Sequence, residues 1–303
     1  MVDFLLDEKH FSALGEYIGF LSDLPCSLAE IEQFSGLFRR SGHVLLTPPD
    51  AQALTRAATD NENRWNAIVC VVPSLGFMVH RLVEKTATFV AEFEQVARDA
   101  MLVTDPPLLG DLDPSRFSPV NVGAQGSNRT ASVMQLIDNL CRRLDECAAA
   151  GARLKALIVS VSQTIHSLFV RFIDSLTLRL CACHGPVPKI EVYYALGRIS
   201  LPGMQYDAGA QHSQAQRKAL AQAHLRALNG LYVRSTSAAN NIADLCHRLG
   251  YFLTQVKLEL QTHDRQQSLR RARASFAQLA YPLAQLRAMA HALRAMPLRV
   301  EAG

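Results

Sequence analysis

The sequence predicts an all-α fold: an elongated antiparallel helical bundle with a long coiled-coil stalk and a small head between its two longest helices. Apolar residues recur along three long stretches with a mean step of about 3.5 residues, which keeps a narrow stripe facing a partner helix. Aromatic residues make up only 7% of the 303 residues and glycines number 16, as is typical of long helices. Proline-rich and glycine-rich breaks between the long stretches let the chain double back.

Residues 1–60 are expected to form short helices. Ser27 and Glu30 have the spacing of a capping box, in which each side chain satisfies a free backbone N–H at a helix start. The prolines in residues 47–50 predict a stop, followed by another short helix that ends near Ala58.

The first long helix is expected over roughly 61–101, with Asp60 or Asn61 as its cap. Its apolar stripe begins at Trp65, and Pro73 is expected to kink it because proline removes a backbone donor and clashes with the preceding turn. Residues 104–128 are rich in proline and form a connector.

The second and third long helices are expected over 129–182 and 210–262, each about 80 Å long at about 1.5 Å per residue. Two helices of matched length joined by a short break must form an antiparallel hairpin. A last helix over 266–296 has Pro282 as a second kink point.

These elements predict three parts. Residues 1–128 and 211–303 form a helical tail bundle with the base of the stalk. Residues 129–182 and 210–262 form the stalk hairpin, and residues 183–209 form the tip.

The tip and the stalk residues next to it have an unusual composition. An apolar island in the tip has two adjacent tyrosines, which suits a partner or membrane surface, although a small tongue packed on the stalk has the same pattern. The stretch Leu157–Leu180 is apolar on one face and mostly uncharged-polar on the other. This pattern suits the wall of a water-filled pore, and it equally suits a buried coiled-coil stripe.

Other functions find little support in the sequence. Phosphate loops, nucleophile elbows and His-Glu-x-x-His motifs do not occur, so we expect no enzyme and no cofactor. Cys181, Cys183 and His184 lack a second ligand pair, so no metal is expected. The net charge of +4 and the scattered basic residues predict no nucleic-acid binding. The seven cysteines suggest no disulfide framework; Cys70, Cys141, Cys147 and Cys246 lie on or beside the apolar stripes.

The N-terminal residues 1–9 are acidic and amphipathic, unlike a signal peptide, and we found no uninterrupted apolar run of about 18 residues. We therefore expect a protein that is made soluble and has no classical signal peptide.

Four segments of the C-terminal third carry a family resemblance: Leu228–Tyr232, Leu249–Leu253, Ser268–Leu269 and Phe276–Leu283. They resemble the alpha-xenorhabdolysin family of binary cytolysins, in which a helix with an aromatic pair precedes a last helix containing an aromatic–proline step. Tyr251-Phe252 and Tyr281-Pro282 match those two features.

The resemblance implies one component of a two-part pore-forming toxin, made soluble in the bacterial cytoplasm and released without a classical signal peptide. With a second component it meets a target-cell membrane, inserts a helical head and closes into a ring. The short chain favours the B-type component, with an A-type subunit as partner. The expected inserting head comprises Leu168, Phe169, Phe172, Ile190, Val192, Tyr193, Tyr194, Leu196, Ile199 and Leu201. The expected hinges are Gly151, Gly185, Pro186 and Pro188.

Two alternatives stay open. A cytosolic coiled-coil scaffold or adaptor would have no effect on membranes. A membrane-curving dimeric crescent would need a basic concave face, for which Arg265, Arg270, Arg271 and Arg273 supply one cluster.

Overall fold

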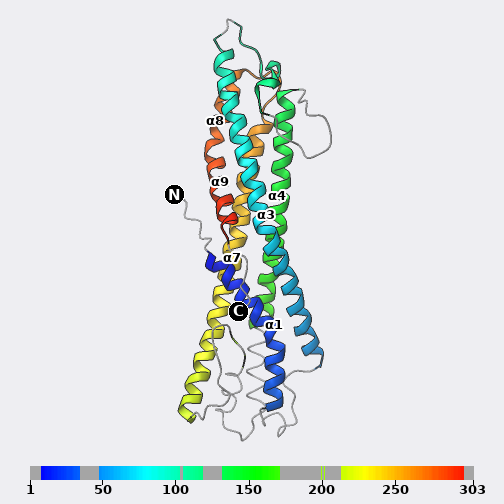
Figure 1. Ribbon diagram of the computed structural model, residues 1–303, viewed down its shortest axis with the longest axis vertical. Helices are drawn as coiled ribbons and strands as arrows, with labels where there is room; N and C mark the ends of the chain where they lie inside the picture. Colours follow the sequence, from blue (N-terminus) through cyan, green and yellow to red (C-terminus); the bar gives the residue numbers. More distant parts are fainter. Residues whose placement is uncertain are drawn as a thin grey trace. The chain divides into compact units, whose positions relative to one another are not determined.

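The computed structural model describes residues 8–34, 48–102, 105–118, 132–170, 199, 201 and 213–296 (Figure 1). The regular elements in these ranges are helices, apart from isolated bridge residues such as Leu108 and Ser268, which form an antiparallel bridge; this confirms the predicted all-α class. The α-helices are α1 (Glu8–Phe34), α3 (Pro48–Ala100), α4 (Val133–Thr164), α7 (Gln214–Gln261), α8 (Leu269–Gln278) and α9 (Ala280–Arg294). Two short 3₁₀ helices, η1 (Leu109–Asp111) and η2 (Pro114–Arg116), lie in the connector, and the π-helix η3 (Ile165–Val170) continues α4.

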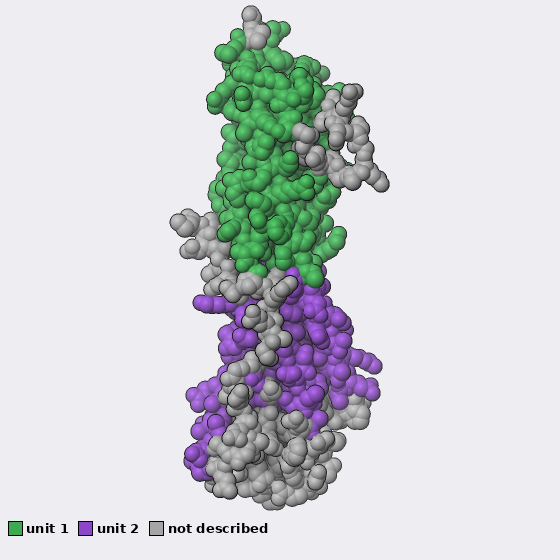
Figure 2. All heavy atoms as spheres, viewed as in Figure 1, with its two compact units in different colours: residues 1–4, 70–155, 244–296 green, residues 5–69, 156–243, 297–303 purple. Residues whose placement is uncertain are grey.

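The chain divides into two compact units, each assembled from segments far apart in the sequence (Figure 2). Unit 1 comprises residues 1–4, 70–155 and 244–296, and unit 2 comprises residues 5–69, 156–243 and 297–303. The division into tail bundle, stalk hairpin and tip stays a prediction, and the tip lies outside the described residues except for Ile199 and Leu201.

The start of the first long helix differs from the expectation. Helix α3 begins at Pro48 and runs for 53 residues, so residues 48–50 start a helix where a stop was predicted. Proline suits the first turn because its missing N–H would have no partner there. Asn61 lies inside the helix and donates from Nδ2 to the Ala57 carbonyl at 2.7 Å, so it is not a cap.

The capping-box interpretation of Ser27 is also wrong, since α1 continues past it and past Pro25. In the predicted last helix, the chain breaks at Leu279 between α8 and α9. Pro282 lies in the first turn of α9, where a proline cannot donate to the preceding turn, and this explains the break.

The predicted apolar stripes form the cores. Along α3, the stripe residues from Trp65 to Val96 are buried, and the described stripe residues of α4 are buried likewise. In unit 1, α3 and α9 approach so closely that a Cβ at Gly76 would lie 3.0 Å from Leu293 Cβ. Only glycine fits there without a shift of the α9 side chains.

Candidate functional site

Residues 156–170, called the stem below, cover the described part of the stretch Leu157–Leu180. They lie in unit 2, in the last turns of α4 and in η3. Residues 156–170 contain no Asp, Glu, Lys or Arg. Ile158, Val161 and Ile165 are buried, whereas Gln163 and Ser167 are exposed on the other side. One face is therefore apolar and the opposite face is polar without charge.

The stem is tied to α7 by a polar contact between side chains. His166 Nδ1 lies 3.3 Å from Tyr232 Oη. The contact lies in the π-helical turn η3, which also contains the backbone of the predicted head residues Leu168 and Phe169. Single π-turns within α-helices are rare and are frequent at functional sites.

Two tip residues belong to the described part, and both are buried: Ile199 is 1% exposed and Leu201 is 5% exposed. His224 of α7 is also buried and hydrogen-bonds to the backbone of Ile199. Desolvation lowers the pKa of His224, and the hydrogen bond to Ile199 opposes this shift in part.

The remaining head residues, Phe172, Ile190, Val192, Tyr193, Tyr194 and Leu196, lie outside the described residues, as do the hinge residues Gly185, Pro186 and Pro188. Gly151 is described and is buried inside α4, where an added Cβ would lie 3.4 Å from Leu249 Cδ2. The assignment of Gly151 as a hinge stays a prediction.

Helix α3 has a property that the sequence analysis missed. Its residues 51–100 include an 18-residue window with a mean hydropathy of 1.6, of which 39% is buried. By length and composition it is the one helix in the described ranges that could cross a membrane, although core helices of soluble bundles meet the same criteria. The signal in the sequence was the run from Trp65 to His80, which has no Asp, Glu, Lys or Arg but is interrupted by Asn, Pro, Ser and Gly.

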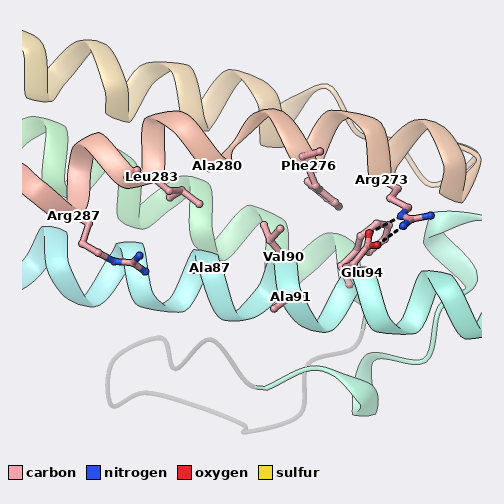
Figure 3. A pocket seen from close by; sticks show the side chains of 12 residues that line it. Ala87, Val90, Ala91, Glu94, Arg273, Phe276, Ala280, Leu283 and Arg287 are labelled. Carbon is pink, nitrogen blue, oxygen red and sulfur yellow. Dashed lines mark hydrogen bonds and ion pairs between the residues drawn. The ribbon is translucent and has the colours of Figure 1, made fainter. Parts of the chain in front are cut away.

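A groove of about 580 Å³ lies in unit 1 between α3 and the α8–α9 pair (Figure 3). Its lining is mostly apolar and includes five alanines: Ala87 and Ala91 on α3, and Ala277, Ala280 and Ala284 on α8 and α9. Phe93, Phe276 and Leu283 supply larger apolar surface. Sequence periodicity did not predict this groove, because it arises where alanines from two elements face each other.

An ion pair lies at each end of the groove, and Figure 3 shows the one between Arg273 and Glu94. At one end Arg287 Nε lies 3.0 Å from Glu84 Oε1. At the other end Arg273 donates to both carboxylate oxygens of Glu94, with Nε at 2.6 Å from Oε2, and Arg98 donates to the same carboxylate at 3.0 Å. The hydrogen bond from Arg273 lowers the pKa of Glu94, with a smaller contribution from Arg98, so this carboxylate is ionised at neutral pH.

The cysteines of the described core behave as small apolar side chains. Burial raises the pKa of Cys141 to about 11 and that of Cys147 and Cys246 to about 12. Cys70, by contrast, is exposed. Within the ranges that the structure describes, no three His, Cys, Asp or Glu side chains gather as metal ligands; Cys181, Cys183 and His184 fall outside those ranges.

The aromatic residues that carry the family resemblance lie together on unit 1. The Phe252 ring packs edge-on against Tyr251 at 5.3 Å and against Tyr281 at 6.0 Å between centroids. Both tyrosines are more than half exposed. The aromatic pair of α7 and the aromatic–proline step of α9 are thus one surface feature.

Comparison with known proteins identifies the fold. No family model matches the sequence, and no curated protein matches it. Among solved structures, the chain is similar to XaxA from Xenorhabdus nematophila, with 10% sequence identity, a TM-score of 0.59 and coverage of 95% of each chain. The two chains share an all-α fold over nearly their whole length.

Proposed function

We propose that this chain is one component of a two-part α-helical pore-forming cytolysin. The observation that carries the proposal is the fold it shares with XaxA across 95% of both chains. The name XaxA belongs to the alpha-xenorhabdolysins, the family that the C-terminal motifs resemble. The similarity in fold and the resemblance in sequence motifs are independent observations, and both support the same class of function.

In this proposal the protein is released in soluble form and meets a target-cell membrane together with its partner. The stem and the predicted head residues then leave the bundle and insert, with Gly151, Gly185, Pro186 and Pro188 as hinges. A helix satisfies its own backbone hydrogen bonds in lipid. The buried face of residues 156–170 would turn to the lipid, and the uncharged polar face would line the lumen of a ring of subunits.

Leakage from liposomes tests the proposal directly. The chain is added to dye-loaded vesicles and to red or insect cells, alone and with the product of the adjacent gene. We expect leakage only when both proteins are present. Pairing the chain with A-type and with B-type proteins in turn tests the B-type role. The absence of leakage in every combination would favour a coiled-coil scaffold.

A reversible crosslink tests the movement of the stem. In a background with Cys26, Cys70, Cys181 and Cys183 changed to serine, His166→Cys and Tyr232→Cys are joined by a bismaleimide that a reductant cleaves. Because the stem can no longer separate from α7, leakage should be lost on crosslinking and return on cleavage.

The matched control joins the same two helices in unit 1. Asp145 and Lys257 form an ion pair at 2.7 Å between α4 and α7, so Asp145→Cys and Lys257→Cys accept the same crosslinker. Leakage should survive this crosslink. Equal loss with both pairs would mean that opening is not confined to the stem, and full leakage with the stem crosslinked would contradict its insertion.

A further inference from the structure

The groove between α3 and α8–α9 combines an apolar channel with an excess of positive charge at one end. Its volume of about 580 Å³ lies within the range of about 300–1,000 Å³ typical of small-molecule sites. Ala277, Ala280 and Ala284 are exposed along the channel, so between Phe276 and Leu283 the α8–α9 side presents only methyl groups at these three positions.

The charge differs between the two ends of the groove. At the Glu84 end one arginine faces one carboxylate, and the charges balance. At the Glu94 end two arginines, Arg98 and Arg273, share one carboxylate, which leaves one positive charge in excess. Helix α8 adds two further arginines, Arg270 and Arg271, and contains no acidic residue.

We propose that this groove binds a single long acyl chain with an anionic head group, that is, a fatty acid. The acyl chain lies along the alanines between Phe276 and Leu283, and the carboxylate meets Arg98 and Arg273. Each apolar carbon buried in the groove contributes through the hydrophobic effect. The head group supplies the negative charge that the Glu94 end lacks, and charge-assisted hydrogen bonds to arginine fix its direction.

This chemistry separates a fatty acid from related ligands. A neutral fatty alcohol fills the channel equally well but leaves the excess charge unmatched. A short carboxylate or inorganic phosphate matches the charge but buries no chain. Binding in solution requires neither vesicles nor a second protein, so the inference stands apart from the proposed pore.

The experiment is a titration of the full chain with oleate, kept below the concentration at which it forms micelles, followed by calorimetry. We expect saturable binding of one oleate per chain, binding of oleyl alcohol that is weaker by about fivefold to tenfold, and none of acetate or phosphate. Arg98→Gln should weaken oleate by a similar factor and leave the alcohol unchanged.

Two variants with matched chemistry test the location. The double variant Ala280→Leu/Ala284→Leu fills the channel from exposed positions and should weaken oleate binding by about tenfold or more. Ala288→Leu is the control, because Ala288 is also exposed on α9 but does not line the groove. Circular dichroism establishes that each variant is folded.

Three outcomes would overturn the proposal. Oleate binding that survives the filled channel places the ligand elsewhere. Equal affinity for oleate and oleyl alcohol removes the role of Arg98 and Arg273. Loss of self-association in the filled variant, with no oleate binding by the original chain, would show that the groove receives a helix of a second copy.

Discussion

The two units differ in their ion pairs and in their buried polar atoms that have no hydrogen-bond partner. In the described part of unit 1, four ion pairs connect different elements, including Glu94 with Arg273 and Asp145 with Lys257, whereas Arg234 with Glu16 is the one such pair in the described part of unit 2. Buried side-chain atoms without a hydrogen-bond partner show the reverse distribution. In the described ranges, unit 2 has Tyr17 Oη, Asn61 Oδ1, His224 Nε2 and Thr236 Oγ1, and unit 1 has His263 Nε2 and Gln267 Oε1.

This difference bears on which unit opens first. A buried polar group without a partner costs about 1–3 kcal/mol relative to its hydrated state, so opening unit 2 recovers several such terms. Segments that move in function come from the less stable parts of a protein. The stem and the two described tip residues belong to unit 2, which agrees with the proposed insertion.

The largest expected effect comes from unit 1. Phe276 is 2% exposed and packs edge-on against Phe89 and Phe93 and face-on against His263. Phe276→Ala should therefore destabilise unit 1 by about 3–5 kcal/mol. Hydrogen exchange of α8 and of residues 86–97 measures the loss. Phe77→Ala, at a side chain that is 57% exposed, is the mild control.

The same variant tests whether the units unfold separately. Trp65 is the single tryptophan of the chain and is buried in unit 2, so its fluorescence reports that unit alone. Phe276→Ala could lower the free energy of unfolding by the same amount in Trp65 fluorescence as in the hydrogen exchange of α8. In that case the two units unfold together, and they do not differ in stability.

A smaller effect should follow from acid acting on unit 2. Burial lowers the pKa of His224 below the reference value of 6.5, so at pH values below 6.5 the unfolded chain binds more protons than the folded one. The stability of unit 2 should therefore fall as the pH drops from 6.5 through the pKa of His224 in the folded state.

Urea titrations followed by Trp65 fluorescence, at about pH 5 and about pH 7.5, measure this dependence. Unit 2 contains other histidines, so the variant His224→Gln isolates the contribution of one residue. We expect a smaller pH dependence in the variant. An unchanged slope would assign the acid sensitivity to other groups.

The sequence predicted the parts of the fold that depend on periodicity. The stripe residues from Trp65 to Val96, and those of α4 and α7, keep one phase over many turns, and burial follows directly from that phase. The expected bounds of 210–262 for the third helix differ little from those of α7. Helix starts were predicted less well. Pro48 is compatible with a break before a helix and with a helix start, and Ser27 is compatible with a cap and with a helix interior. Tertiary packing decides which of these is formed.

The functional residues divide in the same way. The uncharged stem was visible in the sequence, because its composition alone defines it. The groove was not, because Glu94 and Arg273 are 179 positions apart and only packing brings them together. The burial of His224 was missed for the same reason, since its neighbour Ile199 belongs to the tip.

The smallest predicted effects have opposite signs in the two units. Tyr17 Oη is buried in unit 2 without a partner, and burial raises the pKa of the phenol well above its usual range. Tyr17→Phe removes the unsatisfied hydroxyl and should stabilise unit 2 by about 1 kcal/mol. In unit 1, Ser275 Oγ donates to Glu259 at 2.9 Å, so Ser275→Ala should cost about 1 kcal/mol.

Urea midpoints measure whether each substitution raises or lowers stability. Trp65 fluorescence gives the midpoint for unit 2, and hydrogen exchange of α8 gives it for unit 1. Both changes delete one oxygen and add no new group, so they differ only in whether that oxygen had a partner. If both substitutions destabilise, Tyr17 Oη has a partner in solution, such as an ordered water. The described parts of the two units would then have nearly equal numbers of buried polar atoms without a hydrogen-bond partner. The units would then differ only in their ion pairs. Each such pair contributes about 0–1 kcal/mol at the surface, which is too little to make unit 2 open first.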